Sequence, residues 1–149
     1  MSTIKRSALV PYTPRQMFEL VNNIEDYPRF LPWCHQSRVL SKDEKGVRAT
    51  LDIAWSGIHK SFTTHNHLHP YNRVEIELVE GPFKHLEGVW EFIAMGEDGC
   101  KINLDLEFEV AGSVIDKMIE PIFNRIANSL VDAFCKRAVE VYGGQSDSG

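Results

Sequence analysis

Hydrophobic residues recur with two different periods along the chain, and the change between them predicts the order of the elements. Ser2–Val10 alternates loosely and predicts a first strand. From 47 to 110 apolar and polar residues alternate with period two, which is typical of strands with one buried face. From Ser113 the period becomes 3.6 and predicts one long helix over Val114–Tyr142. Its apolar stripe comprises Ile115, Met118, Ile119, Ile122, Ile126, Leu130 and Phe134.

Two short helices are predicted directly after the first strand. Thr13 suits the N-cap of the first, Pro14 its first helical position, and Gln16 the reciprocal position of a capping box. A second helical piece covers residues 25–31 and is interrupted by Pro28. The segment between the first strand and the main sheet is therefore helical.

The middle of the chain predicts an antiparallel meander. Alternation is clearest over 47–55, 58–69, 74–78, 86–92 and 102–110, with Gly- or Pro-containing turns between most of these segments. Strands joined by tight turns pair antiparallel and leave one face wet. We therefore expect an α+β fold in which a curved antiparallel sheet wraps around a single long C-terminal helix. We expect residues 1–142 to form one domain and the Gly/Ser/Asp-rich residues 143–149 to form a flexible tail.

Composition excludes several classes of protein. A chain of 149 residues that is 43% hydrophobic and 25% charged is neither disordered nor a disulfide miniprotein. The net charge of −5 gives no general attraction to nucleic acid or anionic lipid, and we expect no DNA partner. The three cysteines have no C-x-x-C spacing and no signal peptide precedes them, so we expect reduced thiols in a cytoplasmic protein.

Catalytic and metal-ligating motifs are not evident in the sequence. Cys34 and His35 are neighbours in sequence, which does not place the thiol against the imidazole. His65, His67 and His69 alternate on one side of a strand, but successive ones lie about 7 Å apart and no carboxylate motif accompanies them. We therefore expect no catalytic residue, no metal site and no enzymatic activity.

Charged side chains are expected to face solvent. On the strands, the outward acidic residues are Glu75, Glu77, Asp105, Glu107 and Glu109. On the last helix, bases alternate with acids, which indicates a solvated face rather than an RNA-binding stripe. These bases are Lys117, Arg125, Lys136 and Arg137.

Several motifs, taken together and in order, resemble those of the START-like "helix-grip" proteins. The resemblance is closest to the branch that holds the coenzyme-Q-binding proteins and the RatA-type ribosome association toxins, and it covers Ile4 to Tyr142. Glu80 departs from the pattern, because the family often has Asp there. The matching segments are Val10-Pro11-Tyr12-Thr13, Asp26-Tyr27-Pro28-Arg29-Phe30-Leu31-Pro32-Trp33-Cys34, Phe62-Thr63-Thr64, Val79-Glu80-Gly81-Pro82-Phe83-Lys84, and Asp132-Ala133-Phe134 to Val141-Tyr142.

The resemblance implies a deep hydrophobic cavity between the sheet and the long helix. The polar Thr64 and Asn66 would either bind a ligand carbonyl or be satisfied by protein and water. The residues expected to line the cavity are Phe30, Trp55, Phe62, Thr64, Asn66, Trp90, Leu106, Ile122 and Ile126. Trp33, Pro82 and Phe83 are expected at the cavity mouth or in partner-binding loops, the alternative being that Trp33 and Phe83 are core.

Two functions from different classes follow from the resemblance. In the first, the chain binds ubiquinone or another isoprenoid lipid without catalysis, supports respiration, requires no cofactor, and makes transient membrane contact. In the alternative, it is a RatA-like toxin that binds the large (50S) ribosomal subunit and blocks subunit association. A polyketide cyclase-like enzyme ranks third, because no acid–base pair is recognisable.

Overall fold

The computed structural model describes residues 1–55 and 57–143, and of residue 115 it describes the backbone alone. Of the expected tail, 144–149 lie outside the described residues. In chain order the elements are β1 (Ser2–Val10), α1 (Pro14–Asn22), the 3-10 helix η1 (Ile24–Arg29), β2 (Cys34–Lys42), β3 (Gly46–Trp55), β4 (Ile58–His69), β5 (Arg73–Glu80), β6 (Phe83–Met95), β7 (Gly99–Val110) and α2 (Val114–Tyr142).

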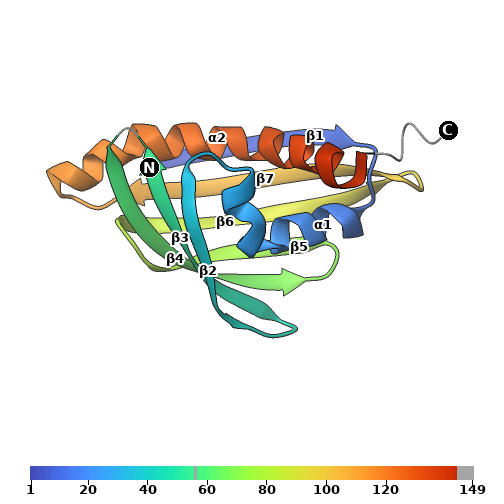
Figure 1. Ribbon diagram of the computed structural model, residues 1–149, viewed down its shortest axis with the longest axis horizontal. Coiled ribbons are helices and arrows are strands. Elements are labelled where there is room, and N and C mark those ends of the chain that lie inside the picture. The colour runs from blue at the N-terminus through green and yellow to red at the C-terminus, as the bar shows by residue number, and fades with distance from the viewer. Residues whose placement is uncertain (56, 144–149) are drawn as a thin grey trace.

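The strands form one seven-stranded sheet in the order β1-β7-β6-β5-β4-β3-β2, and every neighbouring pair is antiparallel. The sheet curls, and α2 packs along β1 and β7 while α1 contacts β6 and β7 (Figure 1). The segment η1 lies against β2. This arrangement confirms the expected α+β helix-grip fold.

The helix boundaries follow from their capping residues. Thr13 Oγ1 accepts a hydrogen bond from the backbone N–H of Gln16 (3.2 Å), and Gln16 Oε1 accepts one from the backbone N–H of Thr13 (2.9 Å), which confirms the capping box. Ser113 caps α2 by accepting from the N–H of Asp116. The second short helix is a 3-10 helix that ends at Arg29, two residues earlier than expected.

One strand, β2, is not predicted by the sequence pattern. It is an edge strand whose side chains are mostly exposed, so few apolar positions mark it. Irregularities between Cys34 and Gln36 and between Val39 and Ser41 also shift its pairing with β3. Each such shift moves the following side chains to the other face, which removes the period-two signal.

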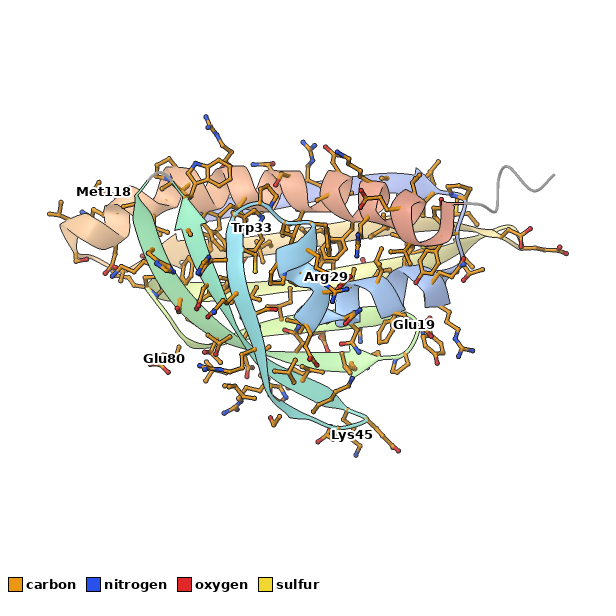
Figure 2. All side chains as sticks on the ribbon, in the orientation of Figure 1. Glu19, Arg29, Trp33, Lys45, Glu80 and Met118 are labelled. Carbon is orange, nitrogen blue, oxygen red and sulfur yellow. The ribbon has the colours of Figure 1, made fainter. Side chains whose placement is uncertain are left out.

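The buried face of α2 differs in part from the predicted stripe. Ile119, Ile126 and Phe134 are buried as expected. Met118 is 54% exposed near the N-terminal end of α2, on the outside of the molecule (Figure 2). The helix carries more apolar positions than the sheet covers, and the buried face is completed by Phe123, Ala127, Val131 and Ala138. No helix among the described residues is both long and apolar enough to cross a membrane.

Candidate functional site

A small cavity lies between the inner face of the sheet and α2. Its volume is about 80 Å³. The wall is mostly apolar and draws on strands β3 to β7, on α1 and η1, and on α2. The lining residues are Val21, Ile24, Tyr27, Trp33, Ala49, Leu51, Phe62, Thr64, Asn66, Ile76, Leu86, Trp90, Leu106, Phe123, Ile126, Leu130 and Phe134.

The structure brings together six of the nine residues expected at the cavity: Phe62, Thr64, Asn66, Trp90, Leu106 and Ile126. The other three lie elsewhere. Phe30 packs on Tyr27 and Phe134 outside the cavity, Trp55 ends β3, and Ile122 is half-buried on the flank of α2. Phe30 and Trp55 lie at the ends of η1 and β3, whereas Ile122 lies within α2 beside its buried face. At such positions period alone does not show which neighbour a side chain meets. Ligand binding by the other six stays a prediction.

The cavity is much smaller than the deep pocket that the resemblance implies. Pockets for drug-sized ligands enclose about 300–1,000 Å³, whereas 80 Å³ is the room of two or three water molecules at about 30 Å³ each. A cluster of four phenylalanines fills the neighbouring space, with ring centroids 4.8–6.3 Å apart. This phenylalanine cluster consists of Phe62, Phe83, Phe108 and Phe123. In this conformation the cavity has room for only a few non-hydrogen atoms of a ligand.

Two polar features remain in the cavity wall. Thr64 Oγ1 donates a hydrogen bond to Asn66 Oδ1 (3.2 Å), so these two side chains satisfy each other in part. Trp33 is buried, with only 4% of its surface exposed. Its indole Nε1 is shielded from solvent and has no hydrogen-bond partner among the described residues. A buried donor without an acceptor costs free energy, and Trp33 is one of the residues that line the cavity.

The residues expected to face partners are mostly buried. Trp33 is part of the cavity wall, and Phe83 is 6% exposed within the phenylalanine cluster. Both rings are therefore placed as the core alternative expected, and β6 begins at Phe83 with the ring on the inner face. A role of this region in gating the cavity or binding a partner stays a prediction. Pro82 is half-buried beside them.

An ion pair joins η1 to α2. Arg137 Nη2 lies 2.8 Å from Asp26 Oδ2, and the two side chains are 19% and 16% exposed. The guanidinium also lies over the ring of Phe30, 5.2 Å from its centroid. The expectation that Arg137 is solvated is wrong, because η1 folds over this part of the helix. The pair holds in place a segment whose Ile24 and Tyr27 line the cavity.

The cysteines are not poised as nucleophiles. Burial raises the pKa of the Cys34 thiol to about 12, and the Asp52 carboxylate adds to the shift. The adjacent His35 points away from it and packs its ring against His59, with centroids 5.4 Å apart. Burial also raises the pKa values of Cys100 and Cys135. Thiolate chemistry at neutral pH needs a lowered thiol pKa, which none of the three shows.

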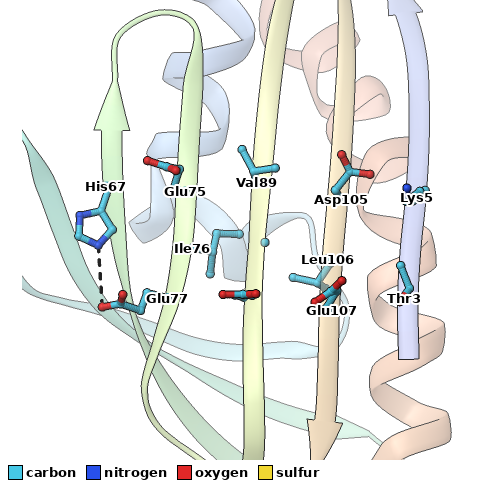
Figure 3. Close-up of a pocket in the computed structure, with 12 residues that line it drawn as sticks. Thr3, Lys5, His67, Glu75, Ile76, Glu77, Val89, Asp105, Leu106 and Glu107 are labelled. Carbon is cyan, nitrogen blue, oxygen red and sulfur yellow. Dashed lines mark ion pairs between the residues drawn. The ribbon is translucent and has the colours of Figure 1, made fainter. Parts of the chain in front are cut away.

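The outer face of the sheet carries the acidic residues, as expected. They surround an open hollow of about 640 Å³ over β4 to β7 and β1, where Figure 3 shows Glu77 and Glu107 on β5 and β7. The histidine row pairs with carboxylates of β5: His69 Nε2 lies 2.7 Å from Glu75 Oε1, and His67 Nε2 lies 3.9 Å from Glu77 Oε1. The hydrogen bond from His69 lowers the pKa of Glu75. His65 has no carboxylate partner among the described residues, and its ring centroid lies 4.6 Å from that of His67, closer than the expected spacing of about 7 Å.

Charge is divided unevenly between the two halves of the sheet. The segment 73–110, which forms β5 to β7, contains three Lys or Arg residues. Its acids are Glu75, Glu77, Glu80, Glu87, Glu91, Glu97, Asp98, Asp105, Glu107 and Glu109. The segment 34–69, which forms β2 to β4, has a basic excess and five of the six histidines. Its bases are Arg38, Lys42, Lys45, Arg48 and Lys60, against Asp43, Glu44 and Asp52.

Comparisons with known proteins identify the family to which the chain belongs and two groups of named relatives. Residues 10–135 match the family described as "Polyketide cyclase / dehydrase and lipid transport". The chain is 49% identical to the Pseudomonas aeruginosa protein named "Ribosome association toxin RatA", over 96% of this chain and 100% of that protein. It is 27% identical to the Xenopus laevis protein named "Coenzyme Q-binding protein COQ10 homolog B, mitochondrial", over 93% of this chain and 59% of that protein.

Solved structures share the fold across distant sequences. The Zhui aromatase/cyclase from Streptomyces sp. R1128 superposes with a TM-score of 0.81 at 14% identity, over 92% of this chain and 93% of that one. At this identity the likeness concerns the fold alone, since one fold hosts many functions.

Proposed function

This chain belongs to the polyketide cyclase/dehydrase and lipid transport family, and from that premise we propose that it is a RatA-like factor that binds the large ribosomal subunit and hinders subunit association. The observation that carries the proposal is its end-to-end similarity, at 49% identity, to a protein named as a ribosome association toxin. Such a factor acts by docking and without catalysis, in the compartment that holds ribosomes. This alternative is favoured over the lipid-binding interpretation, whose named relative is more distant.

The division of charge on the sheet supports one orientation of docking. A ribosomal subunit presents phosphate backbone, which attracts Lys and Arg and repels carboxylates. The half formed by β2 to β4 carries exposed Arg38 and Arg48 on its outer face, whereas the half formed by β5 to β7 is acidic. We expect the basic half to face ribosomal RNA, with the acidic half turned away.

Sedimentation with purified ribosomal subunits tests the proposal. The chain should co-sediment with the 50S subunit and, when added before mixing, reduce formation of 70S particles. The double variant Arg38→Glu/Arg48→Glu should weaken binding at least about tenfold, because each lost phosphate contact also removes counterion release. The matched control is Lys117→Glu/Arg125→Glu, which makes the same charge change on exposed positions of α2.

Two results would contradict this proposal. Failure of the unaltered chain to sediment with either subunit at low salt would remove ribosome association. Equal loss of binding in both double variants would show that net charge matters and that the β2–β4 face does not.

A second function, binding of a carbonyl-bearing lipid, is favoured by one specific observation. The orphan Nε1–H of Trp33 in the cavity wall is the donor that a quinone or ester oxygen would accept from. Native mass spectrometry of the purified chain, followed by organic extraction, would identify such a ligand. Trp33→Phe removes the donor and keeps an aromatic ring, and it should reduce ubiquinone uptake, as should Thr64→Leu/Asn66→Leu. A chain that takes up no added ubiquinone would exclude this function.

A further inference from the structure

The outer face of the sheet holds a group of metal-ligating side chains that no function above uses. His85 and Glu87 stand two residues apart on β6 and share the outer face, and Glu107 on β7 is the direct cross-strand partner of Glu87. One ligand atom from each of the three lies within 4.8 Å of the others. The group is separate from the histidine row on β4 and was not found from the sequence.

The imidazole of His85 lies between the two carboxylates without a hydrogen bond. Its Nε2 is 3.5 Å from Glu87 Oε1 and 3.7 Å from Glu107 Oε2. This nitrogen is itself shielded from solvent and has no hydrogen-bond partner among the described residues, whereas the His85 side chain as a whole is 34% exposed. A shielded nitrogen that faces two carboxylate oxygens and bonds to neither is unsatisfied in the protein alone.

The same place concentrates uncompensated negative charge. Glu77, Glu87 and Glu107 are register partners on three adjacent strands, so their carboxylates form an unbroken row across the sheet. Like charges directly opposite each other on neighbouring strands are destabilising. His67 pairs with Glu77 at the end of the row (Figure 3), whereas Glu87 and Glu107 have no Lys or Arg within ion-pair distance among the described residues.

We propose that His85, Glu87 and Glu107 form a binding site for a divalent transition-metal ion of the zinc class. One imidazole nitrogen and two carboxylate oxygens are a donor set that such ions accept, whereas Mg²⁺ and Ca²⁺ prefer oxygen alone. Ligand atoms about 2.1 Å from one ion lie about 3.0–3.4 Å from each other, close to the 3.5 and 3.7 Å between His85 Nε2 and the two carboxylates. The ligand oxygens of the two carboxylates lie within 4.8 Å of each other and would have to approach. The remaining adjustment falls to the carboxylates, whose side chains are 61% and 48% exposed. Glu87 and Glu107 border the open hollow, which gives the ion access.

Calorimetric titration with Zn²⁺ tests the site on the full chain after treatment with a chelator. The unaltered chain should bind one equivalent of Zn²⁺ at pH 7.5 and bind Mg²⁺ far more weakly. His85→Gln and Glu107→Gln should each weaken Zn²⁺ binding at least about tenfold, since loss of even an indirect partner of a metal ligand costs 10- to 100-fold. Both variants keep side-chain volume, and Glu107→Gln also removes repulsion, so both are expected to fold.

His69→Gln is the matched control, because His69 is also an outer-face imidazole but contacts one carboxylate. It should change Zn²⁺ affinity less than twofold. In addition, the side-chain nitrogen resonances of His85 should shift on addition of Zn²⁺, which locates the ion independently of affinity. The proposal is overturned if Zn²⁺ does not bind saturably, if His85→Gln binds as tightly as the unaltered chain, or if His69→Gln abolishes binding instead.

Discussion

The ion pair between Asp26 and Arg137 should contribute measurably to stability, because both groups are largely withdrawn from water. We expect Arg137→Ala to lower the free energy of unfolding by about 2 kcal/mol. A hydrogen bond between charged groups contributes about 1.5–3 kcal/mol, and the contact with the Phe30 ring adds about 0.5–1 kcal/mol. Arg29 Nε, 3.3 Å from Asp26 Oδ1, remains to compensate the carboxylate in part, so the loss stays below the 3–5 kcal/mol of a fully buried pair.

Urea denaturation of a double-mutant cycle measures this interaction. The variants are Asp26→Ala, Arg137→Ala and the double variant, and the expected coupling free energy is about 1.5–3 kcal/mol. Glu140→Ala is the control, because Glu140 also contacts Arg137 but its side chain is 51% exposed, and it should cost about 0.5 kcal/mol or less. A coupling below about 0.5 kcal/mol would show that the pair behaves as a surface salt bridge and that η1 is held by its apolar contacts alone.

Three further changes test the packing. The pKa of the Cys34 thiol is raised from 9.0 to about 12, so stability should fall above pH 9 by up to about 1.4 kcal/mol per pH unit, and Cys34→Ala should flatten that part of a pH–stability curve. Phe123→Ala should cost about 3–5 kcal/mol in urea denaturation, because Phe123 is 5% exposed within the phenylalanine cluster. Gly88→Ala should lower the melting temperature by an amount equivalent to about 1–3 kcal/mol, because the added Cβ would lie 2.6 Å from Leu106 Cδ1 and 2.9 Å from the backbone oxygen of Asp105. If the Gly88→Ala variant has the same melting temperature as the unaltered chain, the close packing of Gly88 against Leu106 and Asp105 is refuted.

Elements with an unbroken period were predictable from the sequence, and irregular ones were not. The bounds of β1 and α2 agree with the pattern, because Ser2–Val10 alternates, if loosely, and the hydrophobic period changes to 3.6 from Ser113. The strand β2 escaped prediction, since its pairing shifts twice and it lies at the edge of the sheet. Period two gives the face of a side chain only while the register is continuous.

Site residues could be grouped from the sequence only where they lie on the same strand or helix. Phe62, Thr64 and Asn66 share one face of β4, which the alternation predicted, whereas the cavity that they line was expected from the family resemblance. The group of His85 and Glu107 required the register between β6 and β7, which no period encodes. The burial of Arg137 required knowing that η1 folds across α2.

Two features favour docking on a ribosomal subunit over transport of a lipid: the small size of the internal cavity and the uneven distribution of charge over the sheet. Admission of a prenylated quinone would require displacing parts of the phenylalanine cluster, and losing the packing of one such ring costs about 3–5 kcal/mol. Each buried CH₂ of the ligand returns about 0.8 kcal/mol, so several isoprene carbons must be buried before binding becomes favourable. Docking through the β2–β4 face uses side chains that are already exposed and requires no such rearrangement. The proposed surface function is therefore compatible with this fold, because one fold hosts many functions and the side chains of this chain leave a cavity of only about 80 Å³.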